Sequence, residues 1–476
     1  MSTWAHWVRV VGISVASSCV LSTGASAVVD FIVDSTLDQI DNNTSDGVCR
    51  TAVNTCTLRA AVMEANLVTD SAGATIVLAA GIYSLTLPAT GADGPDSGDL
   101  NLTTPASGDP VLRILGAGQS STVIDANHQN RIFEVRYERT AWLAHLTLRN
   151  GYVSAGSVGG GGILNDGSLF LIRSTVSGNE VTVAGGDGGG ILNLVNLYVD
   201  HCTISGNSSG GQGGGIYSNS FASIAESTIV ANVASRDGGG ILSSGFLHAT
   251  DSTISLNTSH GDGGGIYSPE VVGENLTLIQ STIYGNNADG SGGGIYFGSP
   301  PQFNANVFSS TIAGNSADVD ADQNGGNGGG VYVGAGSNFH LRNTLIVGNT
   351  LFNQPIYNEC WGTLNSYGTN LFWEWKASDQ CFIVPQSGIA GYLNSLDDLG
   401  PLQFNGGPTQ TIALLPGSNA IDTGDPELGC IGPDLLPFAT DQRGAARVLG
   451  VRCDVGAYEA GTLFFDGFES GDLSAW

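Results

Sequence analysis

The sequence predicts an all-β protein, a single-stranded parallel β-helix, from a repeat of about 25 residues and the residue types within it. Between residues 159 and 350, a glycine cluster and an aliphatic residue recur seven times, and each repeat closes with S-T-I-x-G-N or a close variant. These runs alternate with a period of two and lack the 3.6-residue apolar stripe of a helix, which excludes a helical solenoid. The aliphatic residues are Ile163, Ile191, Ile216, Ile241, Ile266, Ile295 and Val331, at spacings of 28, 25, 25, 25, 29 and 36.

Each repeat is predicted to form one coil of three short strands, stacked on the next coil at about 4.8 Å. Equivalent side chains then form ladders along the axis. One ladder holds Ser174, Ser227, Ser252, Ser281 and Ser310, with Cys202 as a small buried substitute and therefore a structural thiol. A second, which should satisfy buried turn groups, holds Asn179, Asn207, Asn232, Asn257, Asn286, Asn315 and Asn349. With residues 76–87, 111–123 and 131–148, about ten coils are expected.

Charge and composition exclude several classes of protein. The 476 residues include 15 basic and 43 acidic side chains, for a net charge of −28. Bulk charge of this sign excludes attraction to nucleic acid or to an anionic membrane. Hydrophobic residues make up 41% of the chain, which provides enough apolar material for a core and argues against disorder.

Residues 1–27 are interpreted as a secretory signal, with an apolar stretch and the small residues Ala25-Ser26-Ala27 at the cleavage position. Four serines interrupt the stretch, which argues against a membrane anchor, and no membrane-spanning segment is expected after cleavage. In an oxidising compartment, the sequence-near couples Cys49–Cys56, Cys360–Cys381 and Cys430–Cys453 are the predicted disulfides. These three pairs are chosen from 15 possible connectivities because their cysteines are close in the sequence. A metal site is the competing interpretation, but no couple has the C-x2-C spacing of metal ligands.

Three parts of the chain resemble known families. The GGGI…STISGN pattern resembles right-handed parallel β-helix proteins of the pectin-lyase-like type, including the polymorphic outer-membrane protein repeats of bacterial surface proteins. Asp46-Gly47-Val48-Cys49, Cys56-Thr57-Leu58-Arg59-Ala60 and Glu64-Ala65-Asn66 resemble the CSLREA domain, with Ala60 in place of its usual Glu. The resemblance implies an N-terminal cap at 28–70 with a short helix, before a β-helix at 71–350.

Four motifs near the C-terminus resemble the choice-of-anchor Q domain, which we place at 351–461. They are Asn405-Gly406-Gly407-Pro408-Thr409, Leu415-Pro416-Gly417-Ser418-Asn419-Ala420-Ile421-Asp422, Asp441-Gln442-Arg443-Gly444 and Cys453-Asp454-Val455-Gly456-Ala457-Tyr458-Glu459. The resemblance implies an exported protein, secreted or on the surface of a Gram-negative bacterium. The tail at 462–476 is expected to be either a sorting signal or a disordered or edge-packed terminus.

An acid/base site is the basis of the enzyme hypothesis. The residue before each ladder serine gives Arg173, His201, Glu226, Asp251, Gln280, Ser309 and Arg342. Glu226 and Asp251 would then be stacked neighbours, flanked by His201 and Arg173, as a polysaccharide lyase or glycoside hydrolase would need. The favoured alternative is a solvated face of mixed charge.

No cofactor is required by the sequence, but two acidic groups are candidate Ca²⁺ ligands. Asp237 and Asp262 precede glycine clusters on adjacent coils, where acidic residues also serve as ordinary turn formers. Asp318, Asp320 and Asp322 have D-x-D-x-D spacing, but they lack the Gly and the Glu of an EF-hand loop, so a flexible acidic loop is the favoured interpretation.

Tyr267, Tyr296 and Tyr332 follow the anchor aliphatic on consecutive coils and predict an outward aromatic stripe, suited to sugar rings. We favour instead that the C-terminal domain, through Trp361, Phe372, Trp373 and Trp375, covers this stripe. The sequence as a whole predicts a monomeric, non-catalytic adhesin or scaffold that binds an extracellular glycan or a surface protein. The alternative is a polysaccharide lyase or hydrolase.

Overall fold

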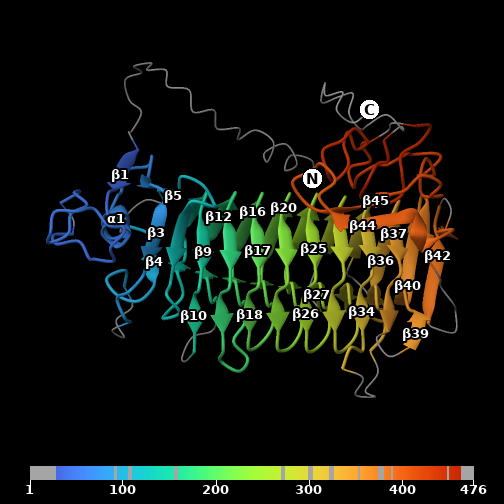
Figure 1. Cartoon of the computed structure of the whole chain (residues 1–476), viewed down its shortest axis with the longest axis horizontal. Helices are drawn as coiled ribbons and strands as arrows, with labels where there is room; N and C mark the ends of the chain where they lie inside the picture. The colour runs from blue at the N-terminus through green and yellow to red at the C-terminus, as the bar shows by residue number, and fades with distance from the viewer. Residues whose placement is uncertain are drawn as a thin grey trace, which may run out of the picture.

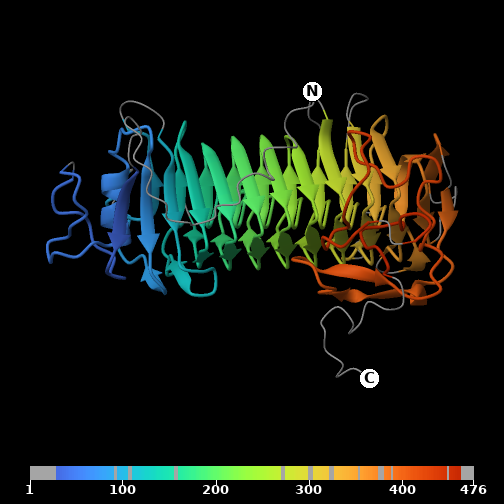
Figure 2. The same cartoon turned by 90° about the horizontal axis from the view of Figure 1, so that it is seen from above.

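The computed structural model shows a long parallel β-helix with a smaller C-terminal segment on one of its sides (Figures 1 and 2). The structure describes residues 28–44, 46–89, 94–105, 110–154, 159–269, 274–298, 304–320, 326–351, 354–373, 380–387, 390–447 and 450–461. The predicted signal at 1–27 and the tail at 462–476 lie outside these ranges. Within them, no helix has the length and apolar character needed to cross a membrane.

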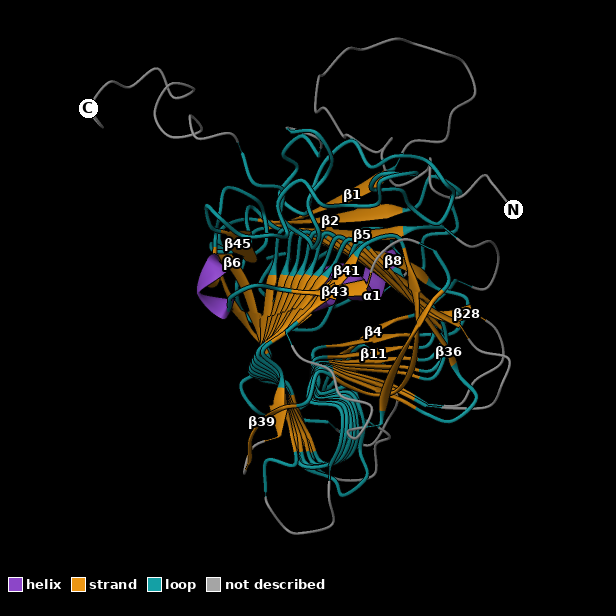
Figure 3. Cartoon of the chain, turned by 90° about the vertical axis from the view of Figure 1, so that its right-hand side faces the viewer, coloured by secondary structure: helices purple, strands orange, loops and turns teal. Residues whose placement is uncertain are grey.

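Each complete coil contains four strands, one on each of four faces, instead of the three expected (Figure 3). From β7 to β38 the described chain makes eight complete coils, with incomplete coils at both ends. The segments 76–87, 111–123 and 131–148 each contribute strands to faces 2 and 3, as expected. We number the faces 1 to 4 in the order in which the chain visits them. Strands within a face are parallel and in register from coil to coil, except for the antiparallel β39 on face 4.

Face 1 contains β4 (Leu100–Leu102), β7 (Phe133–Val135), β11 (Ile163–Asn165), β15 (Ile191–Asn193), β19 (Ile216–Ser218), β23 (Ile241–Ser243), β27 (Ile266–Ser268), β31 (Ile295–Phe297) and β35 (Val331–Val333). Face 2 contains β1 (Val29–Val33), β2 (Ala74–Leu78), β5 (Leu112–Leu115), β8 (Thr140–Ala144), β12 (Ser168–Ile172), β16 (Asn196–Asp200), β20 (Phe221–Ala225), β24 (Leu247–Thr250), β28 (Glu274–Ile279), β32 (Asn304–Phe308), β36 (Asn338–Arg342), β40 (Cys360–Tyr367) and β42 (Cys381–Pro385). The long strand β40 pairs with both faces and joins them.

Face 3 contains β3 (Gly81–Ser84), β6 (Thr122–Asp125), β9 (Thr147–Arg149), β13 (Thr175–Ser177), β17 (Thr203–Ser205), β21 (Thr228–Val230), β25 (Thr253–Ser255), β29 (Thr282–Tyr284), β33 (Thr311–Ala313), β37 (Leu345–Val347), β41 (Asn370–Phe372) and β43 (Ala390–Tyr392). Face 4 contains β10 (Tyr152–Val153), β14 (Glu180–Val181), β18 (Ser208–Ser209), β22 (Val233–Ala234), β26 (Thr258–Ser259), β30 (Asn287–Ala288), β34 (Ser316–Ala317), β38 (Thr350–Leu351) and β39 (Gln354–Tyr357).

The alternation of strand residues divides each coil between core and surface. In β12, Leu169 and Leu171 are completely buried, whereas Phe170 between them is partly exposed. The anchor residues from Ile163 to Val331 form a continuous buried column on face 1. This two-residue period is why the repeats fold as strands, and it fixes which side chains can reach a ligand.

The serine and asparagine ladders are both present. In the serine ladder, the Cys202 N–H donates to Ser227 Oγ at 2.9 Å, and burial raises the pKa of the Cys202 thiol to about 12. In the asparagine ladder, each side chain accepts hydrogen bonds from the backbone and side chain of the preceding coil, as in Asn207 Nδ2 to Asn232 Oδ1 at 2.9 Å. Cys202 is therefore a buried structural residue.

The predicted N-terminal helix is α1 (Leu58–Ala65), whose N-cap Thr57 accepts a hydrogen bond from the Ala60 N–H. Its Arg59 is completely buried and pairs with Asp38 at 2.6 Å. The helix packs against β1 and β2, so α1 lies at the end of the coil stack (Figure 1). Because β1 already belongs to face 2, the β-helix begins within the range assigned to the cap.

The β-helix also extends beyond residue 350, where the sequence placed its end. Strands β40 to β43 continue faces 2 and 3 to Tyr392 without the glycine cluster that marks the earlier coils. The chain contains the disulfides Cys49–Cys56, Cys360–Cys381 and Cys430–Cys453, which are the couples expected. The second of them joins β40 to β42 and ties together the last coils.

The remaining C-terminal segment, residues 393–461, lies on face 3 and contains the antiparallel pair β44 (Leu399–Gln403) and β45 (Thr411–Leu414), with a 3-10 turn at Leu396–Asp398 (Figure 2). A small second core that includes Leu345, Leu371, Ile412 and Val455 joins it to the β-helix. The C-terminal segment is also attached by polar contacts, because it forms hydrogen bonds with a column of threonines on β25, β29 and β33.

Gln442 is the centre of this attachment. Its Nε2 group donates to Thr253 Oγ1 at 3.0 Å, and its Oε1 accepts from Thr282 Oγ1 at 2.6 Å. The third threonine, Thr311, accepts from the Ala457 N–H at 3.0 Å. The motifs around 441–444 and 453–459, which carried the choice-of-anchor Q resemblance, thus hold the C-terminal segment on the β-helix.

Candidate functional site

The four acid/base candidates occupy the turn between faces 2 and 3. Arg173, His201, Glu226 and Asp251 have φ values of 45°, 50°, 46° and 49°, so a left-handed turn residue recurs in each coil. The predicted last member of this row, Arg342, was wrong. The Ser309 N–H donates to Arg342 O at 2.8 Å, which aligns Ser309 with Asn343, and Asn343 has the matching φ of 50°.

His201 and Glu226 form the closest interaction in this row. His201 Nε2 lies 2.9 Å from Glu226 Oε2, and His201 Nδ1 lies 3.1 Å from Asp200 Oδ2. Interactions with Asp200 and then with Glu226 raise the pKa of His201 to about 9. At neutral pH the imidazole is therefore charged, and it neutralises the carboxylate that the enzyme hypothesis requires. Arg173 is exposed at the same turn.

Asp251 has different surroundings because it lies at the edge of the C-terminal segment. Thr409 Oγ1 donates to its carbonyl at 2.9 Å, and Gln442 Nε2 donates to the carbonyl of the next residue, Ser252, at 3.2 Å. Glu226 faces His201, whereas Asp251 lies beside this segment. Glu226 and Asp251 occupy equivalent turn positions on adjacent coils, as expected, and their use as an acid/base pair stays a prediction.

The His201 interaction predicts a pH-dependent stability. The pKa of His201 is about 9 in the folded protein against an ordinary value of 6.5. The stabilisation is therefore complete below about pH 6.5 and is lost as the pH rises through 9. Because the three side chains are 28% to 41% exposed, solvent screening limits the effect to about 1 kcal/mol. His201→Asn should lower the free energy of unfolding at pH 6 and leave it unchanged at pH 10.

His145 supplies the matched control, because its N–H donates to Ile172 O and it occupies the same left-handed turn one coil earlier than Arg173. His145→Asn removes an imidazole from the same turn position but leaves the contacts among His201, Asp200 and Glu226, so the loss of stability specific to pH 6 should be absent. Denaturant unfolding of both variants at pH 6, 8 and 10 measures the difference. An equal pH dependence in the two variants would remove the role assigned to the His201 ion pairs.

The aspartates before the glycine clusters bind backbone groups. Asp237 Oδ1 accepts from the Asp262 N–H at 3.0 Å, and Asp262 Oδ1 accepts from the Ser291 N–H at 2.6 Å. Burial, opposed by the hydrogen bond from Ser291, raises the pKa of Asp262, and the charge of Asp237 adds to the rise. Each aspartate thus links its coil to the next, which is the turn-forming role weighed against Ca²⁺ binding.

The second set of Ca²⁺ candidates lies where the described chain is interrupted. Asp318, whose N–H donates to Gly290 O at 3.0 Å, and Asp320 are described, whereas Asp322 lies outside the described residues. In the described ranges no group of three or more His, Cys, Asp or Glu residues is arranged to hold a metal ion. Ca²⁺ binding stays a prediction.

The tyrosine stripe is present on face 1, where Tyr267, Tyr296 and Tyr332 are in register and half-buried. The ring centroids of Tyr267 and Tyr296 are 4.8 Å apart, and those of Tyr296 and Tyr332 are 4.6 Å apart with an interplanar angle of 11°. Both faces of the Tyr296 ring are therefore occupied by its neighbours. A sugar ring therefore cannot stack on either face of the Tyr296 ring, and the stripe offers ring edges and hydroxyl groups to a ligand instead.

These tyrosines line an open groove of about 510 Å³, together with Pro269, Gly298, Gly334 and Ala335. A Cβ at Gly298 would lie 2.8 Å from Cε1 of Tyr296, so a larger residue there would displace the Tyr296 ring. Burial raises the pKa of Tyr296, and Asp262, the flanking tyrosines and Asp237 raise it further. The hydroxyl of Tyr296 is therefore protonated at neutral pH, and none of the described residues that line the groove is charged.

The expectation that the C-terminal domain covers this stripe was wrong, because that segment lies on face 3. Trp361 instead extends the stripe by one coil, stacked on Tyr332 at 6.5 Å. Phe372 belongs to the core of the β-helix, and Trp373 packs against the second core. Trp375 lies outside the described residues.

A second aromatic row, on face 2, was missed by the sequence analysis. Phe170 stacks on Tyr198 at 4.4 Å, Trp142 lies on one side of the pair and Phe221 on the other. The guanidinium of Arg113 lies 5.9 Å from the centroid of Trp142. The signal was available, since Trp142, Phe170 and Tyr198 each lie between two buried aliphatic residues of successive long strands, and Phe221 begins the next strand at another outward position.

Two segments, residues 201–219 and 251–269, match the family model described as the Chlamydia polymorphic membrane protein (Chlamydia_PMP) repeat. They begin at His201 and at Asp251, and each contains a T-I-S-x-N run and a G-G-G-I cluster. The chain is a β-helix repeat protein. Among solved structures, a crystal structure of pectate lyase Pel9A is similar at 12% identity over 89% of this chain and 96% of that chain, with a TM-score of 0.37. No curated protein matches the chain.

Proposed function

We propose that this chain is an exported protein, secreted or on the surface of a Gram-negative bacterium, that acts without catalysis as an adhesin and binds a neutral extracellular glycan in the tyrosine groove. The match to repeats of a polymorphic membrane protein supports a surface location. Three disulfides support an oxidising compartment outside the cytoplasm.

The groove is the observation that carries the glycan proposal. Three tyrosine hydroxyls follow the axis at the coil spacing, and a hydroxyl can both donate and accept hydrogen bonds to sugar hydroxyls. Gly298 and Gly334 leave room for a chain along the ring edges. Asp237 and Asp262 lie in the turns of the coils next to the groove and the whole chain is acidic, which favours a neutral ligand over an anionic one.

The polysaccharide lyase or hydrolase alternative receives less support from the geometry. Its best base, Glu226, is paired with His201, and the pKa of His201 near 9 leaves that imidazole protonated at neutral pH. The second candidate residue, Asp251, is held through its backbone carbonyl by Thr409 of the C-terminal segment. A catalytic pair needs one group that takes up a proton and one that gives it up in the same open site.

The test replaces the three hydroxyls and keeps the ring stack. The triple variant Tyr267→Phe, Tyr296→Phe and Tyr332→Phe should lose at least about tenfold in affinity, since three hydrogen bonds at about 0.5–1.5 kcal/mol each contribute about 1.5–4.5 kcal/mol. Binding is measured on a panel of neutral and acidic oligosaccharides, with release of reducing ends followed in parallel. Tyr198→Phe, in the aromatic row of face 2, is the matched control.

Three results would count against the proposal. Equal binding by the triple variant and by Tyr198→Phe would place any glycan site elsewhere. Release of products that is abolished by Glu226→Gln would replace the adhesin by the enzyme. Absence of binding to every oligosaccharide would leave no support for the glycan role.

A further inference from the structure

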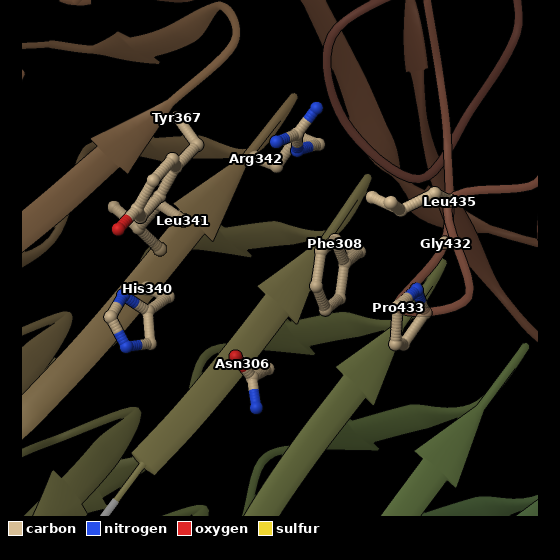
Figure 4. Close-up of a pocket in the computed structure, with 9 residues that line it drawn as sticks. All are labelled: Asn306, Phe308, His340, Leu341, Arg342, Tyr367, Gly432, Pro433 and Leu435. Atoms are coloured by element: carbon tan, nitrogen blue, oxygen red, sulfur yellow. The ribbon is translucent and has the colours of Figure 1, made fainter. Parts of the chain in front are cut away.

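A second pocket, of about 240 Å³, lies between the outer surface of face 2 and a turn of the C-terminal segment (Figure 4). Its floor is made by β32, β36 and β40, and its wall is the turn from Gly432 to Leu435. This volume is below the roughly 300–1,000 Å³ of sites for drug-sized ligands, and it suits a ligand of about one ring.

Strand register explains the floor. Asn306 aligns with His340, and Phe308 aligns with Arg342, which in turn aligns with Tyr367. Outward residues alternate with buried ones along each strand, so these five side chains form one patch on neighbouring strands (Figure 4). The rings of His340 and Tyr367 lie 5.5 Å apart at 59° and form one side of it.

The wall is held in place by several independent contacts. The Cys430–Cys453 disulfide closes the loop, and the Gly432 N–H donates to Leu436 O at 2.9 Å. Asn343, next to the pocket floor, donates to Gly429 O at 2.9 Å and accepts from the Asp425 N–H at 2.8 Å. The pocket is thus preformed and does not depend on a ligand to bring its two sides together.

The chemistry of the lining differs from that of the rest of this acidic chain. Asn306, His340, Arg342 and Tyr367 supply hydrogen-bond donors, and none of the lining residues is a carboxylate. Arg342 Nη1 donates to Oδ2 of the buried Asp425 at 3.2 Å, and this ion pair holds the guanidinium beside the pocket. Phe308, Pro433 and Leu435 supply apolar contact. A guanidinium and other hydrogen-bond donors next to an apolar surface are suited to bind a small ring that carries a carboxylate group.

We propose that this pocket binds an acidic monosaccharide, either free or at the end of a glycan, with its carboxylate toward Arg342 and its ring against Phe308 and Pro433. This site goes beyond the tyrosine groove and has the opposite charge preference. The C-terminal segment thereby contributes directly to recognition, in addition to covering face 3.

The test uses sodium glucuronate, with glucose as the neutral match, in calorimetric titrations of the full chain. Leu435→Glu places a negative charge at the rim of the pocket. Because Leu435 is 69% exposed, the substitution should not disturb folding. It should weaken glucuronate binding about tenfold by charge repulsion. Leu436→Glu is the matched control, because Leu436 is 63% exposed in the same turn and does not line the pocket.

The expected result is glucuronate binding that Leu435→Glu weakens and Leu436→Glu leaves unchanged. The triple tyrosine variant should also bind glucuronate normally, so failure of the groove proposal and failure of this one can be told apart. Equal binding of glucose and glucuronate, equal effects of the two glutamates, or no glucuronate binding at millimolar concentration would each overturn the proposal.

Discussion

Replacing Arg59 with alanine is expected to destabilise the N-terminal cap by about 3–5 kcal/mol, because it removes one partner of a buried ion pair. Arg59 Nε lies 2.6 Å from Asp38 Oδ1, and the two side chains are 0% and 1% exposed. The guanidinium also donates to Pro95 O at 2.9 Å and to Gly98 O at 2.8 Å. Alanine leaves a buried carboxylate without its cation and two carbonyls without donors.

The loss should be local, because each coil of a solenoid contacts only its neighbours. Hydrogen exchange should therefore accelerate in α1 and in strands β1 to β5, and remain slow in the central coils. Arg50→Ala is the control, since Arg50 is exposed in the loop that precedes the helix and should change stability by less than about 0.5 kcal/mol. A similar effect of the two substitutions, or an increase in exchange spread evenly over all coils, would contradict the assignment.

The fold could be predicted because the same pattern of residue types recurs in every coil. A glycine cluster, a buried aliphatic and a buried asparagine recur in order, so one coil predicts the next. The signal ends after Asn349, although β40 to β43 continue the helix. In these coils the pairing depends on alternation alone, as in Leu364 opposite Phe339, and a short alternating run has no distinctive spacing.

The position of the C-terminal segment could not be read from the sequence for a related reason. It binds Thr253, Thr282 and Thr311, but the same column continues through Thr175, Thr203 and Thr228 on uncovered coils. Identical repeats carry no information on which of them is covered. The tyrosine stripe could be placed by alternation, whereas the mutual stacking of its rings required side-chain geometry.

The candidate acid/base row shows a third limit. The spacing of the repeats correctly predicted that His201 and Glu226 are neighbours, since they occupy equivalent turn positions on adjacent coils. It omitted Asp200, which reaches His201 from the end of the preceding strand. The pocket at Arg342 was missed altogether, because one of its walls comes from residues about 90 positions later in the chain.

The asparagine ladder provides the second large prediction. Asn257 is completely buried, accepts from the Asn232 N–H and Nδ2 at 3.0 Å, and donates to Ile229 O at 3.0 Å and to Asn286 Oδ1 at 2.9 Å. Asn257→Ala should lower the free energy of unfolding by about 3 kcal/mol or more, because four buried groups each lose a partner at a cost of about 1–3 kcal/mol where none replaces it. Leu256→Ala is the control, since Leu256 is adjacent and 54% exposed.

Asn257→Asp separates polarity from shape. The aspartate can still accept from Asn232, but a buried carboxylate faces the oxygen of Asn286 and the carbonyl of Ile229, so it should cost at least as much as alanine near neutral pH. Denaturant unfolding of the three variants, with local exchange around β21 to β29, measures the effects. If both substitutions at Asn257 behaved like Leu256→Ala, the ladder would have no stabilising role.

The end of the ladder supports this reasoning. Each asparagine accepts from the preceding coil and donates to the next, so the series needs a final group that only accepts. Glu359, 1% exposed, has this role. Its Oε2 accepts from Asn349 Nδ2 at 2.6 Å, and its Oε1 accepts from the Gly348 N–H at 2.7 Å. A carboxylate at this position satisfies the last donors of the ladder, and an alanine at Asn257 would interrupt the same series near its centre.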